Sequence, residues 1–204
     1  MERVGIYGGT FDPIHNGHLA IAEEACWALG LARLYVVPAV RQPLKAGPQG
    51  ASPEQRLAMA LLGCAGNPRL VVSDIELRRP SPSYTIDTLY SFRALLGEAV
   101  NMHLIMGADA LVSMDRWHHA PEIVNLAQLA VLTRPGVILD FEQLEREIPG
   151  IMARTTLIEG PQLNISGTDL RRRLAEGRPV RYQLPEAVSD YIQSRGLYHE
   201  NNDD

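Results

Sequence analysis

Two histidines near the amino end are spaced so that both could act on one ligand. His15 and His18 lie three residues apart at the end of the stretch GGTFDPIHNGH, residues 8–18. If a helix begins here, both rings face the same side of its first turn. Neutral imidazole donates one hydrogen bond and imidazolium adds a positive charge. Two such rings therefore suit the negative charge that builds on a phosphoryl group during transfer.

The backbone around the histidines favours the same chemistry. Gly8 and Gly9 allow conformations and close approaches that a Cβ would block, and the unpaired N–H groups of a helix start suit a phosphate. Two other interpretations stay open: a metal site that adds Asp12 and Asp109 to the histidines, and a purely structural turn. A dinucleotide-binding fingerprint is excluded, because the stretch does not match GxGxxG.

A second candidate phosphate site lies near the carboxyl end, in the stretch ISGTDLR, residues 165–171. Ser166 or Thr168 can cap a helix, and their hydroxyls and the first-turn N–H groups can bind phosphate. Arg171 follows Thr168 by three residues, so its forked donor lies on the same helix face. We interpret the two arginines that follow it as a solvated basic face.

Strands and helices alternate along the chain. Runs of apolar residues predict strands over residues 4–7, 34–37, 69–72, 102–106, 129–133 and 155–158. Periodicity and capping signals predict helices over residues 17–29, 53–64, 83–96 and 168–174, the second of them with Ser52 as N-cap and Gln55 as capping-box partner.

This alternation indicates an α/β fold with a doubly wound parallel sheet covered on both faces. Ligands bind beyond the carboxyl ends of the strands in such folds. Every distinctive segment of this chain follows a predicted strand, namely residues 8–18, 38–45, 107–109 and 134–136. The sequence therefore predicts a ligand site at this edge of the sheet.

The bulk properties bound the class of protein. The 204 residues carry a formal net charge of −5, which argues against non-specific binding of nucleic acid. No apolar run reaches the length of about 18 residues that a membrane helix needs, and we expect no signal peptide. Cys26 and Cys64 lie in apolar runs, so we expect buried, reduced thiols and a cytoplasmic protein.

We expect one domain over residues 1–204, with a C-terminal helical part over about 160–198. The acidic tail, residues 200–204, is expected to fray. The sequence leaves the oligomeric state open, and residues 121–149 could carry the interface of a homo-oligomer.

The histidine stretch and the serine stretch both resemble motifs of one superfamily. Residues 8–18 resemble the signature of the nucleotidyltransferase α/β-phosphodiesterase superfamily, with its HxGH core, and residues 165–171 resemble its ISSTxxR motif, with Gly167 where serine is usual. The resemblance implies a Rossmann-like nucleotidyltransferase fold with a small C-terminal helical region. It also implies an ATP and phosphate site formed by Gly8, Gly9, Thr10, Phe11, His15, His18, Ser166, Thr168 and Arg171.

Segments between the two motifs are similar to those of bacterial nicotinate mononucleotide adenylyltransferases. These segments are SYTIDTL at 83–89, GADA at 107–110 with Trp117 after it, TRPG at 133–136 and the ending at 191–198. The resemblance covers nearly the whole chain and implies adenylyl transfer from ATP, with Mg²⁺, to nicotinate mononucleotide. The mononucleotide site that it implies comprises Lys45, Tyr84, Thr85, Asp109, Trp117 and Arg134.

The chemistry of these side chains fits a pyridine mononucleotide. Trp117 offers a flat face for the ring, and the N–H groups and hydroxyl at Tyr84 and Thr85 could donate to a carboxylate. Asp109 could accept hydrogen bonds from ribose hydroxyls. Structural interpretations stand beside these: Trp117 could fill a core edge, and Thr85 could only cap its helix.

Residues 38–45 take the place of the family's PxxxPPHK loop. Leu44 replaces the usual histidine, whereas Lys45 is kept and is expected to reach a phosphate. Arg56 fits the family's EQR element, and it could hold this loop, bind phosphate or form a surface ion pair.

The resemblance implies that His18, His15 and Lys45 are catalytic, with His18 donating to the α-phosphate of ATP. Lys45, Ser166, Thr168 and Arg171 would hold the leaving pyrophosphate, and no protein side chain is expected to ligate the metal. Nicotinamide mononucleotide or phosphopantetheine as acceptor, and an inactive nucleotide-binding regulator, remain as alternatives.

Overall fold

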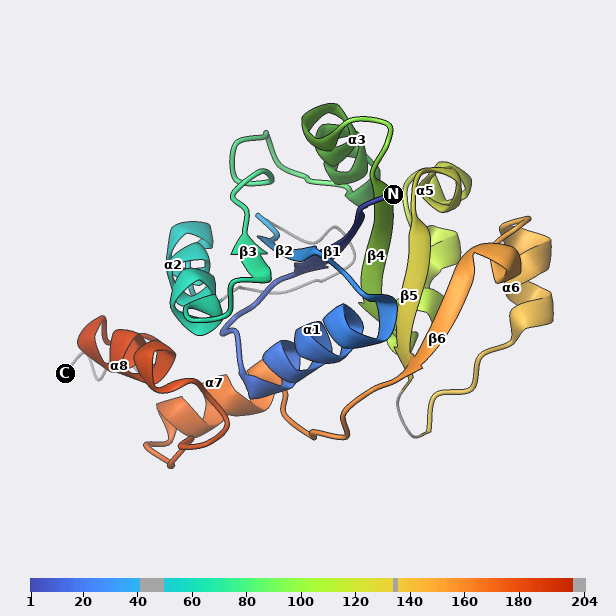
Figure 1. Ribbon diagram of the computed structural model, residues 1–204. Helices are drawn as coiled ribbons and strands as arrows, with labels where there is room; N and C mark the ends of the chain where they lie inside the picture. Colours follow the sequence, from blue (N-terminus) through green and yellow to red (C-terminus); the bar gives the residue numbers. More distant parts are fainter. Residues whose placement is uncertain (41–49, 134–135, 200–204) are drawn as a thin grey trace.

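The computed structural model describes residues 1–40, 50–133 and 136–199. Its centre is a six-stranded parallel sheet in the order β3-β2-β1-β4-β5-β6 (Figure 1). The strands are β1 (Arg3–Gly9), β2 (Arg33–Pro38), β3 (Leu70–Val72), β4 (Asn101–Gly107), β5 (Gln128–Thr133) and β6 (Thr155–Glu159).

Helices cover both faces of the sheet (Figure 1). The first layer holds α1 (Asn16–Leu29), α2 (Pro53–Cys64), α7 (Gly167–Ala175) and α8 (Glu186–Ser194). The second layer holds α3 (Thr85–Leu96), α4 (Ala108–Val112), α5 (Ala120–Leu126) and α6 (Phe141–Glu147). Two short 3₁₀ turns, η1 (Met114–Arg116) and η2 (Met152–Arg154), complete the connections.

Alternation along the strands separates two cores. In β2, Leu34 and Val36 pack against the first helix layer, whereas Tyr35 and Val37 pack against the second. Successive side chains of a strand point to opposite faces, so a strand covered on both sides must be apolar throughout. The doubly wound α/β fold that the sequence predicts is therefore confirmed, and each predicted strand falls on an observed one.

Helix starts agree less closely with the sequence. The cap of α2 is as predicted, since the Ser52 hydroxyl accepts from the Gln55 N–H at 3.3 Å and the Ser52 N–H donates to Gln55 Oε1 at 2.8 Å. The start of α3 was predicted two residues too early, because Tyr84 is its N-cap. The short helices α4, α5 and α6 were not predicted, because five to seven residues carry too little periodicity.

The sheet has its topological switch point between β1 and β4, which are neighbours in the sheet although two strands separate them in sequence. The chain leaves β1 toward α1 in the first layer and leaves β4 toward α4 in the second. A crevice at the carboxyl ends of the strands is expected there. None of the helices in the described ranges is both long and apolar enough to cross a bilayer.

His103 of β4 is a buried titratable group in this core. It is 7% exposed, and within the described part of the chain neither ring nitrogen has a hydrogen-bond partner. Burial, aided by the charge of Arg3, lowers the pKa of His103 below 6.5. The unfolded chain therefore binds more protons than the native state as the pH falls through 6.5, which costs stability.

We predict that His103→Leu weakens this loss of stability in acid. Between about pH 7.5 and about pH 5.5 the variant should lose less unfolding free energy than the wild type, because it has no ring to protonate. Urea unfolding at both pH values measures the difference, with His199→Leu as the control at an exposed histidine. Equal losses in His103→Leu and the wild type would contradict the prediction.

Candidate active site

The two histidines meet at the start of α1, as the sequence predicts. His15 is the N-cap, and its backbone N–H donates to Nδ1 of His18 at 3.3 Å. Their rings stack with centroids 3.6 Å apart and planes 22° apart. Because Nδ1 of His18 accepts, the neutral ring carries its hydrogen on Nε2 and can donate from there. His15 is 4% exposed, whereas His18 is only partly buried.

Phe11 forms a wall beside His18. Its φ is +49°, its side chain is 2% exposed, and its ring lies edge-on to Tyr7 at 5.4 Å and to His18 at 5.0 Å. A Cβ on Gly9 would lie 2.9 Å from the Phe11 ring, so Gly9 is required by this packing. A Cβ on Gly8 would meet nothing within 4 Å, so the binding role of Gly8 stays a prediction.

Arg56 joins the ends of β1 and β2 beneath the site. It is 0% exposed and donates to backbone carbonyls of four residues, at 2.6 to 3.3 Å: Thr10, Ala39, Val40 and Ala51. Burial lowers the pKa of Arg56, and the nearby Asp12 carboxylate opposes that shift. The surface ion pair was therefore a wrong interpretation of Arg56, and the loop-holding interpretation is confirmed.

The carboxylate of Asp12 is 5% exposed and accepts hydrogen bonds from two other segments of the chain. It accepts from the N–H of Gly50 at 2.9 Å and of Ala51 at 3.1 Å, and from the Tyr198 hydroxyl at 2.6 Å. Burial and the bond to Asp12 both raise the pKa of Tyr198, so the phenol stays protonated and donates. A metal site would need the carboxylate oxygens of Asp12 as ligands. These oxygens already accept hydrogen bonds from backbone N–H groups and from a phenol, which argues against the metal interpretation.

The start of α7 lies against the start of α1 (Figure 1). Arg171 donates from Nη1 to the backbone carbonyl of Asp12 at 2.6 Å, and that nitrogen is 3.6 Å from the Asp12 carboxylate. A Cβ on Gly167 would lie 2.8 Å from the same carbonyl oxygen. At Gly167, where the motif usually has serine, a Cβ therefore cannot fit unless the two backbones shift.

Ser166 caps α7 by accepting from the Asp169 N–H at 3.2 Å, while Ser166 and Thr168 both remain exposed at the helix start. The predicted cap is confirmed. Arg172 and Arg173 pair with Asp169 and lower the pKa of that carboxyl to about 2. The solvated face expected for these two arginines is confirmed for Arg172, whereas Arg173 is partly buried.

The residues expected to bind the acceptor lie around the start of α3 and the end of η1. The Tyr84 ring lies 4.5 Å from the His118 ring, which brings residues 84–85 beside residues 117–118. Trp117 is partly buried against the second core. It can therefore fill the edge of that core and still offer an exposed part of its ring for stacking on a ligand. The structure corrects the capping interpretation of Thr85, since Tyr84 is the N-cap and Thr85 is the first helical residue. Asp109 is exposed in the first turn of α4.

Two predicted site residues, Lys45 and Arg134, lie outside the described residues, as do Leu44 and the tail over 200–204. Their roles stay predictions. The other predicted residues lie at the carboxyl edge of the sheet or on α7, which packs against that edge.

Comparison with protein-family models shows the family to which the chain belongs. The model for cytidylyltransferase-like proteins matches residues 6–173. The chain belongs to the cytidylyltransferase-like family. Two of its relatives, from Roseiflexus sp. (strain RS-1) and Roseiflexus castenholzii, are 54% and 50% identical to it and are named probable nicotinate-nucleotide adenylyltransferase. The alignments cover 96% of this chain and 97% and 98% of the relatives.

The fold of this cytidylyltransferase-like chain is also similar to a solved structure. Plasmodium falciparum nicotinic acid mononucleotide adenylyltransferase, in complex with NaAD, aligns with a TM-score of 0.78 over 97% of this chain and 98% of that chain. At 20% identity this likeness concerns the fold alone. The resemblance carried by the motifs is thus confirmed by the relatives, and the Rossmann-like nucleotidyltransferase fold by the structure.

Some residues of this cytidylyltransferase-like site were missed or underrated from sequence. Asp12 was weighed only as a metal ligand, and Tyr198 only as part of the chain's ending. A Tyr–Asp bond across 186 residues leaves no local pattern to read. His118 follows Trp117 directly and could have been included by its place in the motif.

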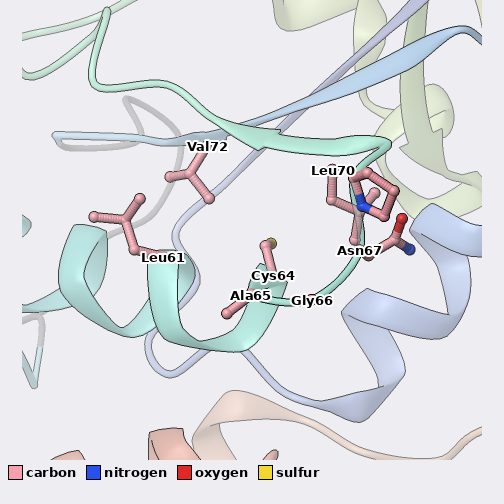
Figure 2. A pocket seen from close by; sticks show the side chains of 8 residues that line it. Leu61, Cys64, Ala65, Gly66, Asn67, Leu70 and Val72 are labelled. Carbon is pink, nitrogen blue, oxygen red and sulfur yellow. The ribbon is translucent and has the colours of Figure 1, made fainter.

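A separate apolar groove lies outside this site. It lies between the end of α2 and β3 (Figure 2). Its volume is about 380 Å³. Its lining residues are Leu61, Cys64, Ala65, Gly66, Asn67, Pro68, Leu70 and Val72. These lining residues include no predicted site residue.

Cys26 and Cys64 are both buried free thiols, and burial raises the pKa of each to about 11.

We predict that Tyr198→Phe destabilises the protein by about 1–2 kcal/mol. The change removes the donor to a buried carboxylate and leaves that oxygen poorly satisfied. Chemical unfolding measures the loss, and Tyr182→Phe is the matched control because Tyr182 is 84% exposed. Equal stability of Tyr198→Phe and Tyr182→Phe would contradict the importance of the bond.

Gly167→Ser, which restores the usual motif residue, should cost about 1–3 kcal/mol, the range for forcing atoms into a packed site. The new Cβ must push the Asp12 carbonyl away from 2.8 Å. Thermal unfolding of Gly167→Ser beside Gly8→Ala tests this, since a Cβ at Gly8 meets nothing within 4 Å. A Gly167→Ser variant as stable as the wild type would show that the two backbones separate freely.

Proposed function

We propose that this protein transfers the adenylyl group of ATP to nicotinate mononucleotide, forming deamido-NAD and pyrophosphate in NAD biosynthesis. The observation that carries this proposal is the meeting of two helix starts at the switch point of the sheet. One start bears the His15–His18 pair, the other bears exposed hydroxyls, and Arg171 joins them through Asp12. The names of the relatives support the same reaction.

The acceptor phosphate needs no general base. It is already an anion at neutral pH, with a second pKa of about 6, so it can attack the α-phosphorus of ATP in line. Catalysis then consists of positioning and charge stabilisation. His18 donates from Nε2 to the α-phosphate as charge develops, and His15 contacts the other phosphates. The bond from the His15 N–H to Nδ1 holds the His18 ring in the required tautomer.

The leaving pyrophosphate is held by donors at the start of α7. Ser166 and Thr168 present exposed hydroxyls there, and the first-turn N–H groups carry partial positive charge. Arg171 keeps one nitrogen on the Asp12 carbonyl, which orients its guanidinium toward the same place. Lys45 completes this donor set, and Gly8, Gly9, Thr10 and Phe11 form its floor.

Mg²⁺ accompanies the ATP in this proposal and neutralises charge on the triphosphate. Among the described residues, no group of three His, Cys, Asp or Glu side chains could hold a metal ion. We expect the Mg²⁺ to be held by the phosphates and by water rather than by a protein cage.

The acceptor binds on the α3 side. Trp117 stacks on the pyridine ring, and the N–H groups at Tyr84 and Thr85 receive the carboxylate. Asp109 accepts from the ribose hydroxyls, while Arg134 and Lys45 reach the mononucleotide phosphate. We place the reaction in the cytoplasm, which suits two buried free thiols.

Pyrophosphate release with ATP and Mg²⁺ tests the proposal. Nicotinate mononucleotide, nicotinamide mononucleotide and phosphopantetheine are offered separately, and strong preference for the first is expected. Preference for another acceptor would replace the substrate assignment. Nucleotide binding without release from any acceptor would favour an inactive regulator.

We predict that His18→Ala lowers kcat by about 10²-fold or more, the scale of losing one transition-state donor. Binding of ATP should change much less, because the donation strengthens only as charge develops. Steady-state rates and ATP titration separate the two effects, with His199→Ala as the control at an exposed histidine. Near wild-type turnover in folded His18→Ala would remove this role from His18.

A further inference from the structure

A partly buried arginine lies directly behind the first turn of α3. Arg79, in the connection between β3 and α3, donates from Nη2 to the Ser83 hydroxyl at 2.8 Å and to the Thr88 hydroxyl at 2.5 Å. Its Nη1 donates to the Ser91 hydroxyl at 3.1 Å. Because Ser83 precedes the N-cap and Thr88 is one turn into the helix, the guanidinium is held against the turn that contains Thr85.

The charge of Arg79 is only partly balanced. Glu76 is 7% exposed, lies 4.0 Å from Arg79 and accepts from the Thr88 hydroxyl at 2.7 Å. Burial raises the pKa of Glu76, while the Thr88 and Ser83 hydroxyls and Arg79 favour its charged form. The Arg79 side chain is 22% exposed, so water screens its charge less than that of a surface arginine.

The start of α3 adds partial positive charge from its N–H groups, which the carboxylate of Asp87 in the same turn offsets in part. The helix has 12 residues, its N-cap is Tyr84, and the Tyr84 side chain makes no capping hydrogen bond. The first-turn N–H groups therefore carry their partial positive charge on the side where the acceptor is placed. Arg79 lies behind the same turn, so helix and guanidinium attract an anion together.

A nicotinate carboxylate and a nicotinamide carboxamide have nearly the same shape and differ in charge. Polar groups alone can bind either, whereas a fixed positive charge favours the acid. We propose that Arg79 sets the preference of this site for an acid over an amide acceptor, as a positioning residue that acts through the first turn of α3. This inference rests on the proposed function, since it concerns the acceptor of that same site.

Three variants test the role of Arg79. Arg79→Gln removes the charge, Arg79→Lys keeps it, and Arg78→Gln is the matched control, because Arg78 is 74% exposed and pairs with Asp74. The readout is the ratio of kcat/KM for nicotinate mononucleotide to that for nicotinamide mononucleotide. Arg79→Gln should lower this ratio about 10-fold, which corresponds to about 1.4 kcal/mol. Arg79→Lys and Arg78→Gln should keep most of it, and the KM for ATP should stay unchanged.

A merely structural role predicts a different result. Both acceptors would then lose activity equally in Arg79→Gln, and the unchanged ratio would overturn the inference. If Arg79→Gln does not fold because Glu76 is left buried without its partner, the double variant Glu76→Gln/Arg79→Gln removes both charges and should show a smaller fall in the same direction. The wild-type protein distinguishes failure of the proposed function from failure of the role of Arg79. If the wild type does not turn over nicotinate mononucleotide, the proposed function itself is refuted.

Discussion

The buried carboxylate of Asp12 is the interaction on which the phosphate side of the site depends. A buried carboxylate is costly unless donors satisfy it, and here the donors come from residues 50–51 and from Tyr198. The backbone carbonyl of the same residue holds Arg171. All these segments must be in place for the charge to be satisfied, so the histidine loop, the start of α2, α7 and the carboxyl end order one another.

Arg56 also holds loop segments together, but through a buried positive charge. Its guanidinium is fully buried and is bonded to backbone carbonyls at the ends of β1 and β2. Carbonyls at strand ends have lost their ladder partners and must be satisfied another way. Arg56 and Asp12 thus hold the described residues that follow β1 and β2 and that precede α2. A chain with a net charge of −5 can still present a positive site, because helix starts and a few held cations supply it locally.

Local patterns in the sequence predicted most of the fold. The six strands and the capping box at Ser52 follow from apolar runs and capping residues, and the predicted start of α1 at residue 17 is one residue late. The packing of Phe11 over Gly9, and the approach of Gly167 to Asp12, depend on distances between segments and could not be predicted. The motifs named the residues of the site, but not which of them bind one another.

The two halves of the site are held by different kinds of contact. On the phosphate side, decisive bonds join residues 159 and 186 positions apart, so a change there disturbs the whole arrangement. On the acceptor side, the bonds of Arg79 and Glu76 to Ser83 and Thr88 span only 4 to 12 positions around the start of α3. Sites without shared partners respond independently to substitution. If the proposed acceptor site is correct, substitutions around α3 should change the acceptor preference with little effect on the contacts of Asp12 and Arg171.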